Sequence, residues 1–223
     1  MKHRLEKHLI EKRPCVLCLP ERAEQPIPLF LCHVGPEAEQ LFADVFRVLP
    51  KDGPLFALAA ATDVSWDRDY TPWPSDCLPG RTFSGGADAY LDFVEASLAP
   101  WAGRTVQSRA RYHLGYSLGG LCALYALTRD SGCAGAASVS GALWYPGFVR
   151  FFQENRPDAP VYCSLGRAES RTRNPVICTG AQCAQEIAAR PGDRFEWTNG
   201  NHFFEIPQRI ALAARRLLEN AGE

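Results

Sequence analysis

The sequence has almost no net charge and no long hydrophobic run. Its 223 residues carry a formal charge of −1, so neither nucleic acid nor an anionic membrane surface is expected as a partner. The longest apolar stretches, such as Leu55–Ala61, are far shorter than the roughly 20 residues that a helix needs to span a bilayer. The N-terminus is charged throughout and lacks the apolar core of a signal peptide. A cytoplasmic protein is the resulting expectation.

The sequence also lacks a disulfide framework. It contains nine cysteines, an odd number, and we expect free and mostly buried thiols. Cys15 and Cys18 have the C-x-x-C spacing, but they lie in the strand-like segment Arg13–Pro20, where residues three apart point to opposite faces. Cys178 and Cys183 have no second pair at zinc spacing. We therefore expect neither a metal nor another cofactor.

Apolar runs of strand length alternate with helical patterns along the chain. No repeat or composition shift divides it, so residues 1–223 are expected to form a single domain. The predicted strands are Arg13–Pro20, Ile27–Val34, Pro54–Ala61, Arg109–Tyr116, Gly135–Gly141, Val161–Gly166 and Asp193–Gly200. The predicted helices are Gly35–Pro50, Ala87–Trp101, Leu118–Asp130, about Asn174–Arg190, and Ile206–Gly222. This alternation predicts an α/β three-layer sandwich, with a mostly parallel sheet and helices on both faces.

One short segment, Gly115–Gly119, has the pattern G-x-S-x-G. In a nucleophile elbow the serine lies on a sharp turn between a strand and a helix, and the two glycines leave room for the neighbouring backbone. A predicted strand precedes Ser117 and a predicted helix follows it, as the elbow requires. The helix N-terminus would also favour a developing negative charge. Although the pattern occurs by chance in glycine-rich chains, this context makes Ser117 a candidate nucleophile.

A catalytic serine needs a base, and the base needs an acid that orients it. Of five histidines only His202 follows Ser117, and it lies in a loop between the last predicted strand and the last helix. Glu169 comes three residues after the predicted strand Val161–Gly166 and is the favoured acid. Glu205, close to His202 in sequence, is the weaker alternative.

Other interpretations of these residues stay open. Asp158 and Asp193 precede their strands and belong to the opposite end of the sheet. His202 could simply cap the last helix. Glu169 could pair at the surface with a nearby arginine, for which the sequence offers Arg167, Arg171 and Arg173.

Two backbone N–H groups are expected to stabilise an oxyanion. The first is that of Leu118, directly after the serine. The second should come from the loop after the strand Ile27–Val34, where Pro36 has no N–H. Gly35 is the favoured donor and Val34 the alternative.

Aromatic residues in two loops are expected to line a substrate pocket. Trp66 and Tyr70 lie in the long segment Thr62–Gly86, and Trp144 and Tyr145 follow a predicted strand. The same residues could instead anchor their loops to the core. Arg68 or Arg167 could meet an anionic substrate, with weaker support.

Several motifs together resemble a known family. "GYSLGGLCALYAL", "SVSGALWYPGF", "VYCSLGRAESRTRNP", "NGNHF" and "WDRDYTPWP" followed by "FSGGADAYL" are similar to esterases of the α/β-hydrolase fold, a family that includes siderophore (enterochelin) esterases and esterase-D-like enzymes. The resemblance covers most of the chain from Pro28 onward and is strongest to short bacterial members without a large cap.

The resemblance implies metal-free, cofactor-free hydrolysis of a small-molecule carboxylic ester through an acyl-enzyme. Ser117 would be the nucleophile, His202 the base and then the acid, and Glu169 the orienting acid. The sequence departs from the family pattern because it offers only about two strands before the first helix, so the sheet is expected to be shortened at that edge. Some relatives work with serine and histidine only, which leaves the need for Glu169 open.

Two other functions fit the same motifs. An acyltransferase would use the same three residues with a different acceptor, and a non-catalytic binding protein could keep the α/β-hydrolase fold. The ordered serine, acid and histidine favour catalysis over binding. Whether the chain forms a homo-oligomer stays open.

Overall fold

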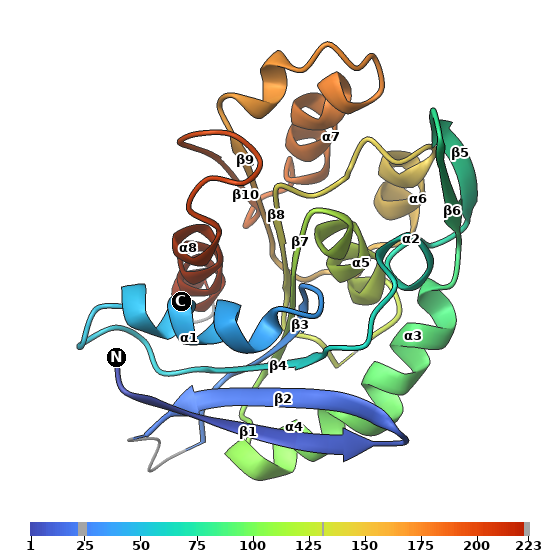
Figure 1. The fold of residues 1–223 in the computed structure, drawn as a ribbon. Helices are drawn as coiled ribbons and strands as arrows, with labels where there is room; N and C mark the ends of the chain where they lie inside the picture. Colours follow the sequence, from blue (N-terminus) through green and yellow to red (C-terminus); the bar gives the residue numbers. More distant parts are fainter. Residues whose placement is uncertain (22–25, 131, 221–223) are drawn as a thin grey trace.

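A computed structural model describes residues 1–21, 26–130 and 132–220 of the chain (Figure 1). The strands are β1 (His3–Ile10), β2 (Arg13–Pro20), β3 (Leu29–His33), β4 (Ala57–Ala61), β5 (Pro74–Leu78), β6 (Arg81–Ser84), β7 (Arg111–Tyr116), β8 (Ala136–Val139), β9 (Val161–Gly166) and β10 (Arg194–Thr198). The helices are α1 (Ala38–Val48), α2 (Trp66–Asp69), α3 (Ala87–Phe93), α4 (Ala99–Val106), α5 (Leu118–Leu127), α6 (Phe148–Asn155), α7 (Gly180–Ile187) and α8 (Ile206–Asn220).

Eight of these strands form one sheet in the order β1-β2-β4-β3-β7-β8-β9-β10. The pairs from β4 through β10 run parallel, whereas β1–β2 and β2–β4 are antiparallel. The remaining strands, β5 and β6, make a separate antiparallel hairpin. Because parallel strands end on the same edge, the loops after β3, β7, β8, β9 and β10 all lie at one end of the sheet.

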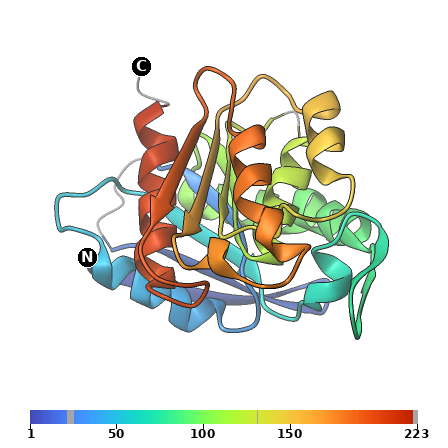
Figure 2. The ribbon, with the colours of Figure 1, turned by 90° about the horizontal axis from the view of Figure 1, so that it is seen from above.

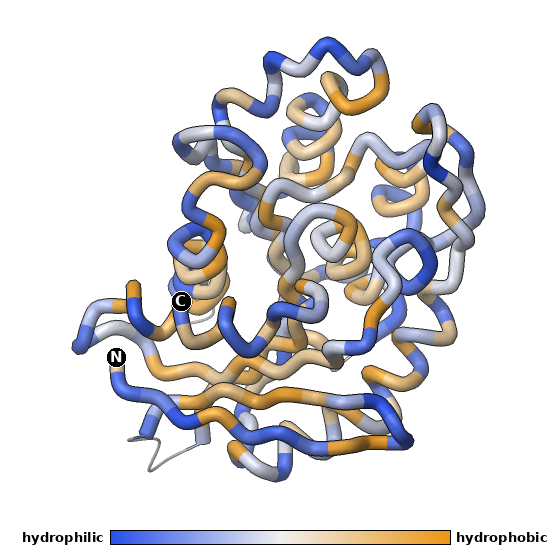
Figure 3. The backbone as a smooth tube through the Cα atoms, in the orientation of Figure 1, coloured by the Kyte–Doolittle hydropathy of each residue, from blue (hydrophilic) through white to orange (hydrophobic). Residues whose placement is uncertain are grey.

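Helices cover both faces of the sheet, and Figure 2 shows these layers from above. The apolar residues of α1 and α8 pack on one face, and those of α3 to α7 pack on the other. Successive strand residues serve opposite faces, as Ala57 and Leu58 of β4 do. The central strands β3, β4, β8 and β9 are therefore buried along their whole length, and Figure 3 shows much hydrophobic colour in the centre of the molecule. The predicted α/β three-layer sandwich is confirmed.

The cysteines behave as small core residues. Cys15 packs on the α3–α7 face and Cys18 on the α1–α8 face, as the strand prediction requires. All nine cysteines have free thiols, and six of them are buried. No helix in the described part of the chain combines the length and the apolar character that crossing a membrane requires.

The N-terminal edge corrects one expectation. The structure has three strands before α1 instead of about two, and the sheet is not shortened there. The additional strand is β1, which pairs with β2 along its whole length. As an edge strand whose residues are all exposed or half-buried, β1 has a charged sequence that does not show the apolar pattern of a buried strand.

The segment Thr62–Gly86 is more ordered than a long loop. It contains the short helix α2 and the β5–β6 hairpin. The helix predicted over Ala87–Trp101 is present but contains a π-helical turn at Val94–Leu98 between α3 and α4. Helix α6, which the sequence analysis does not include, follows the aromatic segment after β8.

A buried ion pair fixes the end of the sheet opposite these loops. Both guanidinium NH groups of Arg156 donate to Asp193, at 2.7 and 2.8 Å, and the two side chains are 3% and 1% exposed. Asp193 also accepts the backbone N–H of Val161 at the start of β9. The pair therefore joins the end of α6 to the starts of β9 and β10. This position confirms that Asp193 lies away from the candidate site.

Replacing Arg156 by Ala should lower the free energy of unfolding by about 3 to 5 kcal/mol, because it leaves the Asp193 carboxylate buried without its partner. Urea unfolding measures this change. The matched control is Arg150→Ala, which breaks an exposed ion pair with Glu154 on α6 and should leave the free energy of unfolding close to the wild-type value. Equal effects of the two substitutions would contradict this prediction.

Candidate functional site

Ser117 lies in a strained turn between β7 and α5. Its backbone has φ 58° and ψ −124°, a region that residues with a side chain rarely adopt. Two hydrogen bonds anchor the turn, from the Ser117 N–H to the Val139 carbonyl and from the Ala142 N–H to the Ser117 carbonyl. The turn lifts the serine side chain off the end of the strand, as the G-x-S-x-G pattern predicts.

Two glycines allow this turn to form. A Cβ on Gly115 would lie 1.8 Å from the carbonyl oxygen of Gly119, and a Cβ on Gly119 would lie 1.8 Å from that of His33. Both distances are impossible for a real side chain. The first turn of α5 therefore packs directly against the ends of β7 and β3, and only glycine fits at these positions.

His202 and Glu169 lie beside the serine in a continuous chain of polar contacts. Nε2 of His202 is 3.1 Å from Oγ of Ser117, and its Nδ1 is 2.6 Å from Oε2 of Glu169. The three residues follow β7, β9 and β10, whose ends share one edge of the sheet. Tyr116 supports the histidine loop, since its hydroxyl donates to the His202 carbonyl at 2.7 Å. The structure thus brings together the three residues that the sequence analysis singles out.

A cavity of about 660 Å³ opens in front of these residues. Ser117, Glu169 and His202 line it, together with the polar residues Ser140 and Arg171. Its apolar walls come from several loops and comprise Trp66, Leu78, Trp144, Leu165, Ile177 and Phe203. The site therefore combines a polar floor with aromatic and aliphatic walls, which is typical of a small-molecule pocket.

Three solved structures with the same architecture are distant from this chain in sequence. The siderophore hydrolase EstA from Aspergillus nidulans matches with a TM-score of 0.74 at 16% identity, over 100% of this chain and 95% of that chain. Siderophore hydrolase EstB from Aspergillus nidulans matches with a TM-score of 0.69 at 15% identity, over 96% of this chain and 94% of that chain.

Est1E from Butyrivibrio proteoclasticus matches with a TM-score of 0.64 at 12% identity, over 98% of this chain and 99% of that chain. The chain has the α/β-hydrolase fold. No model of a protein family and no curated protein sequence matches it. At these identities the structural likeness shows the fold and leaves the chemistry to the residues of the site.

Within this hydrolase fold, Glu169 occupies a dense hydrogen-bond network. Its Oε1 accepts from the Ser140 hydroxyl at 2.6 Å, the Gly166 N–H at 2.7 Å and the Arg209 guanidinium at 3.1 Å. Burial alone would raise the pKa of Glu169, but the hydrogen bonds from His202, Ser140 and Gly166 outweigh it and lower the pKa to about 2. Glu169 therefore remains ionised, and its contacts differ from the surface arginine pairing that was the alternative.

Three residues that contact Glu169 or the His202 loop are not predicted from the sequence. Ser140 directly follows β8, and its place at the carboxyl end of a parallel strand was an available signal. Tyr116 precedes the serine at the end of β7, and in the sequence it has the pattern of a residue in a buried strand. Arg209 lies on α8, in an amphipathic pattern that gave no sign of a buried charge.

The predicted pocket aromatics divide into two groups. Trp66 and Trp144 line the cavity. Tyr70 and Tyr145 instead lie in the core, at 0% and 2% exposure, and the Tyr145 hydroxyl bonds to the Trp73 carbonyl. These two rings fill the core beneath the loops that surround the cavity.

The arginines proposed for an anionic substrate also need correction. Arg68 pairs with Asp69 at 2.7 Å and does not line the cavity. Arg167 is also absent from the lining, whereas Arg81 and Arg171 belong to it.

The two expected oxyanion donors have different surroundings. Leu118 begins α5, so its N–H has no acceptor within the helix. Gly35 has φ 98°, and a Cβ there would lie 2.7 Å from the ring of Trp66. The buried hydroxyl of Tyr70 lies near the backbone of Gly35 and has no hydrogen-bond partner among the described residues. Val34, the alternative oxyanion donor, lies in the same turn.

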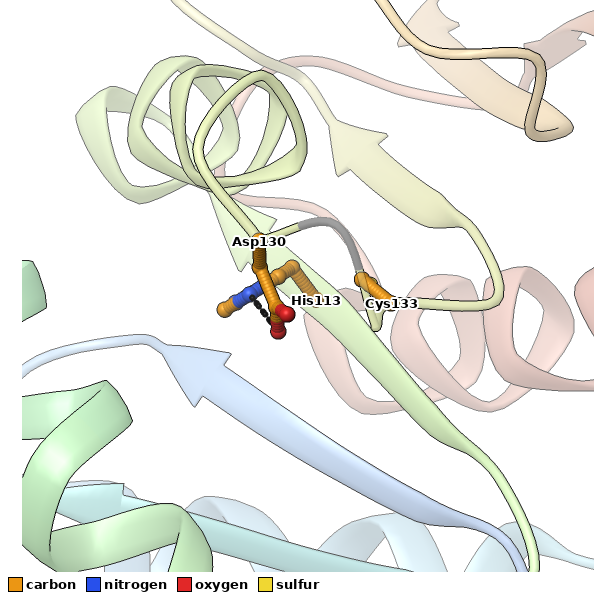
Figure 4. A group of neighbouring side chains, drawn as sticks. All are labelled: His113, Asp130 and Cys133. Carbon is orange, nitrogen blue, oxygen red and sulfur yellow. Dashed lines mark ion pairs between the residues drawn. The ribbon is translucent and has the colours of Figure 1, made fainter.

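A second polar cluster lies under α5, away from the serine. Figure 4 shows His113 on β7 beside Asp130 and Cys133 of the turn that follows α5, and their ligand-type atoms lie within 4.8 Å of one another. Arg111 donates to both Asp130 oxygens, at 2.5 and 3.1 Å, and His113 lies 3.5 Å away. Burial would raise the pKa of Asp130, but its bonds with His113 and Arg111 lower it below the usual range. The charge that would attract a metal cation is therefore already compensated.

Substitutions at Ser117 should report the strain of the elbow. Glycine tolerates the observed backbone angles and alanine does not, so Ser117→Gly should be about 1 kcal/mol more stable than Ser117→Ala in urea unfolding. At Ser138, in the regular strand β8, the order should reverse, because glycine loses more chain entropy on folding. Finding alanine more stable at both positions would argue against strain at Ser117.

Glu169 should make stability depend on pH in the acid range. Its folded-state pKa of about 2 lies below the ordinary value of 4.5, so its stabilising contribution is complete above about pH 4.5 and is lost as the pH falls toward 2. Glu169→Gln should lower the free energy of unfolding at pH 7 by roughly 2 kcal/mol, and the difference from wild type should vanish near pH 2. Urea unfolding across this range provides the measurement. A difference that is constant with pH would refute the claim.

Proposed function

We propose that this protein is a serine hydrolase that cleaves carboxylic esters through an acyl-enzyme intermediate. The observation that supports the proposal best is the contact chain from Ser117 Oγ through His202 to Glu169, with gaps of 3.1 and 2.6 Å, at the floor of an open cavity. These distances are those of a serine activated by a base that an acid holds in place.

In the proposed first step, Ser117 Oγ attacks the ester carbonyl carbon while His202 Nε2 accepts the hydroxyl proton. Glu169 accepts the Nδ1–H of the same ring and stabilises the resulting imidazolium. His202 then protonates the leaving alcohol as the carbon–oxygen bond breaks. A water molecule, deprotonated by His202, hydrolyses the acyl-enzyme and restores the serine.

The negative charge on the carbonyl oxygen would be stabilised by backbone N–H groups. Leu118 supplies one donor at the N-terminus of α5, and the turn Val34–Gly35 supplies the second. The close packing of Gly119 against His33 supports this pairing, because it brings α5 and the turn after β3 together. In such enzymes the loss of one donor slows the reaction roughly 100- to 1,000-fold.

The structural neighbours favour ester hydrolysis among the reactions open to this arrangement. Two of them, EstA and EstB, are named as siderophore hydrolases. The aromatic walls at Trp66, Trp144 and Phe203 suit an ester with an apolar or aryl group. Transfer of the acyl group to an alcohol uses the same residues and is the second candidate, because an open cavity admits acceptors other than water.

A fluorophosphonate probe should label the wild-type protein and leave Ser117→Ala unlabelled. Turnover of a panel of aryl, short-chain and thioesters should fall at least about 1,000-fold in Ser117→Ala. Ser170→Ala, which removes an exposed serine hydroxyl close to Glu169 in sequence, should behave like wild type. Equal labelling of Ser117→Ala would overturn the proposed nucleophile. Acyl transfer that exceeds hydrolysis when an alcohol is added would favour the transferase.

A further inference from the structure

Arg209 is a buried cation that the proposed reaction does not itself use. It lies near the start of α8, its side chain is 4% exposed, and it does not line the cavity. Burying a guanidinium is costly unless it is paired and hydrogen-bonded. The partners of Arg209 therefore indicate why the charge is there.

The hydrogen-bond partners of Arg209 are Glu169, Ser140 and a backbone carbonyl of the histidine loop. One terminal nitrogen of Arg209 donates to Oε1 of Glu169 at 3.1 Å and to the Ser140 hydroxyl. The other donates at 3.2 Å to the carbonyl of Asn201, the residue before His202. A single side chain thus contacts the loops after β8, β9 and β10.

The contacts divide the two carboxylate oxygens of Glu169 between two tasks. Oε1 accepts from Ser140, Gly166 and Arg209, whereas Oε2 is 2.6 Å from His202 Nδ1. A carboxylate held at one oxygen by three donors cannot rotate without breaking them. Oε2 is consequently fixed toward the imidazole.

We propose that Arg209, acting with Ser140, is a positioning residue that orients Glu169 and the His202 loop for catalysis. The inference rests on the proposed function, since it assigns Glu169 the role of orienting acid. Arg209 also places a positive charge 3.1 Å from the buried Glu169 carboxylate, and a nearby opposite charge favours the ionised form. The charged and titratable groups that face Glu169 are Arg209, His202 and Tyr116.

The kinetic test compares Arg209→Met, Arg209→Lys and Ser140→Ala with wild type. Arg209→Met should lower kcat roughly 10- to 100-fold while KM changes little, because misplaced reacting groups slow the chemical step and Arg209 does not touch substrate. Arg209→Lys should recover part of the loss, since it restores the charge without the two-pronged contact. The control is Arg216→Met on the same helix, which breaks partly exposed ion pairs with Glu196 and Glu219 and should keep wild-type kcat.

A second measurement does not depend on activity. Carbon NMR of the Glu169 carboxyl group, assigned with Glu169→Gln, should give a pKa of about 2 in wild type. The pKa should rise by at least about one unit in Arg209→Met and rise in Ser140→Ala, because each change removes a donor to the ionised form. Ser140→Ala provides the same readout should Arg209→Met fail to fold.

The outcomes separate the two proposals. Wild type that neither labels with fluorophosphonate nor cleaves esters would reject the proposed function, while the NMR titration would still report whether Arg209 and Ser140 hold the carboxylate. A labelled and active wild type whose kcat and Glu169 pKa are unchanged in folded Arg209→Met would show that Arg209 only joins α8 to the sheet, and would overturn the positioning role.

Discussion

The site depends on the direct contact between the first turn of α5 and the ends of two strands. Side chains at Gly115 or Gly119 would overlap the backbone that each glycine touches. Because the helix begins so close to the sheet, Ser117 is forced into its unusual backbone angles and its hydroxyl leaves the strand end. The strain is local, and the buried layers of the α/β-hydrolase fold on both sides hold it in place.

Parallel strand topology turns this local feature into a site. The serine, the acid and the histidine lie far apart in sequence, yet each follows a strand whose end reaches the same edge. Two buried arginines stabilise opposite ends of these strands. Arg156 holds the starts of β9 and β10, opposite the candidate site, whereas Arg209 joins the loops at their far ends. One fixes the sheet, and the other fixes the groups that the proposed reaction uses.

Several predictions from sequence rest on local rules and were confirmed. The alternating apolar runs gave the α/β sandwich because a strand buried on both faces must be apolar throughout. The opposite placement of Cys15 and Cys18 followed from the two-residue period of a strand. Strand β1 was not predicted, because an edge strand in water needs no apolar pattern. Tyr70 and Tyr145 were placed in the pocket because sequence position cannot tell a loop aromatic that faces a cavity from one that fills the core.

The sequence by itself determined the elbow at Ser117, the choice of His202 as its downstream histidine, and the mostly parallel character of the sheet. These follow from spacing, chain order and periodicity, which act over a few residues. Only the tertiary structure decided that Ser140, Gly166 and Arg209 converge on one oxygen of Glu169. Such a network depends on where separate loops meet, and a buried arginine on an amphipathic helix looks in sequence like any solvated one. The packing of α8 against the sheet turned that arginine inward.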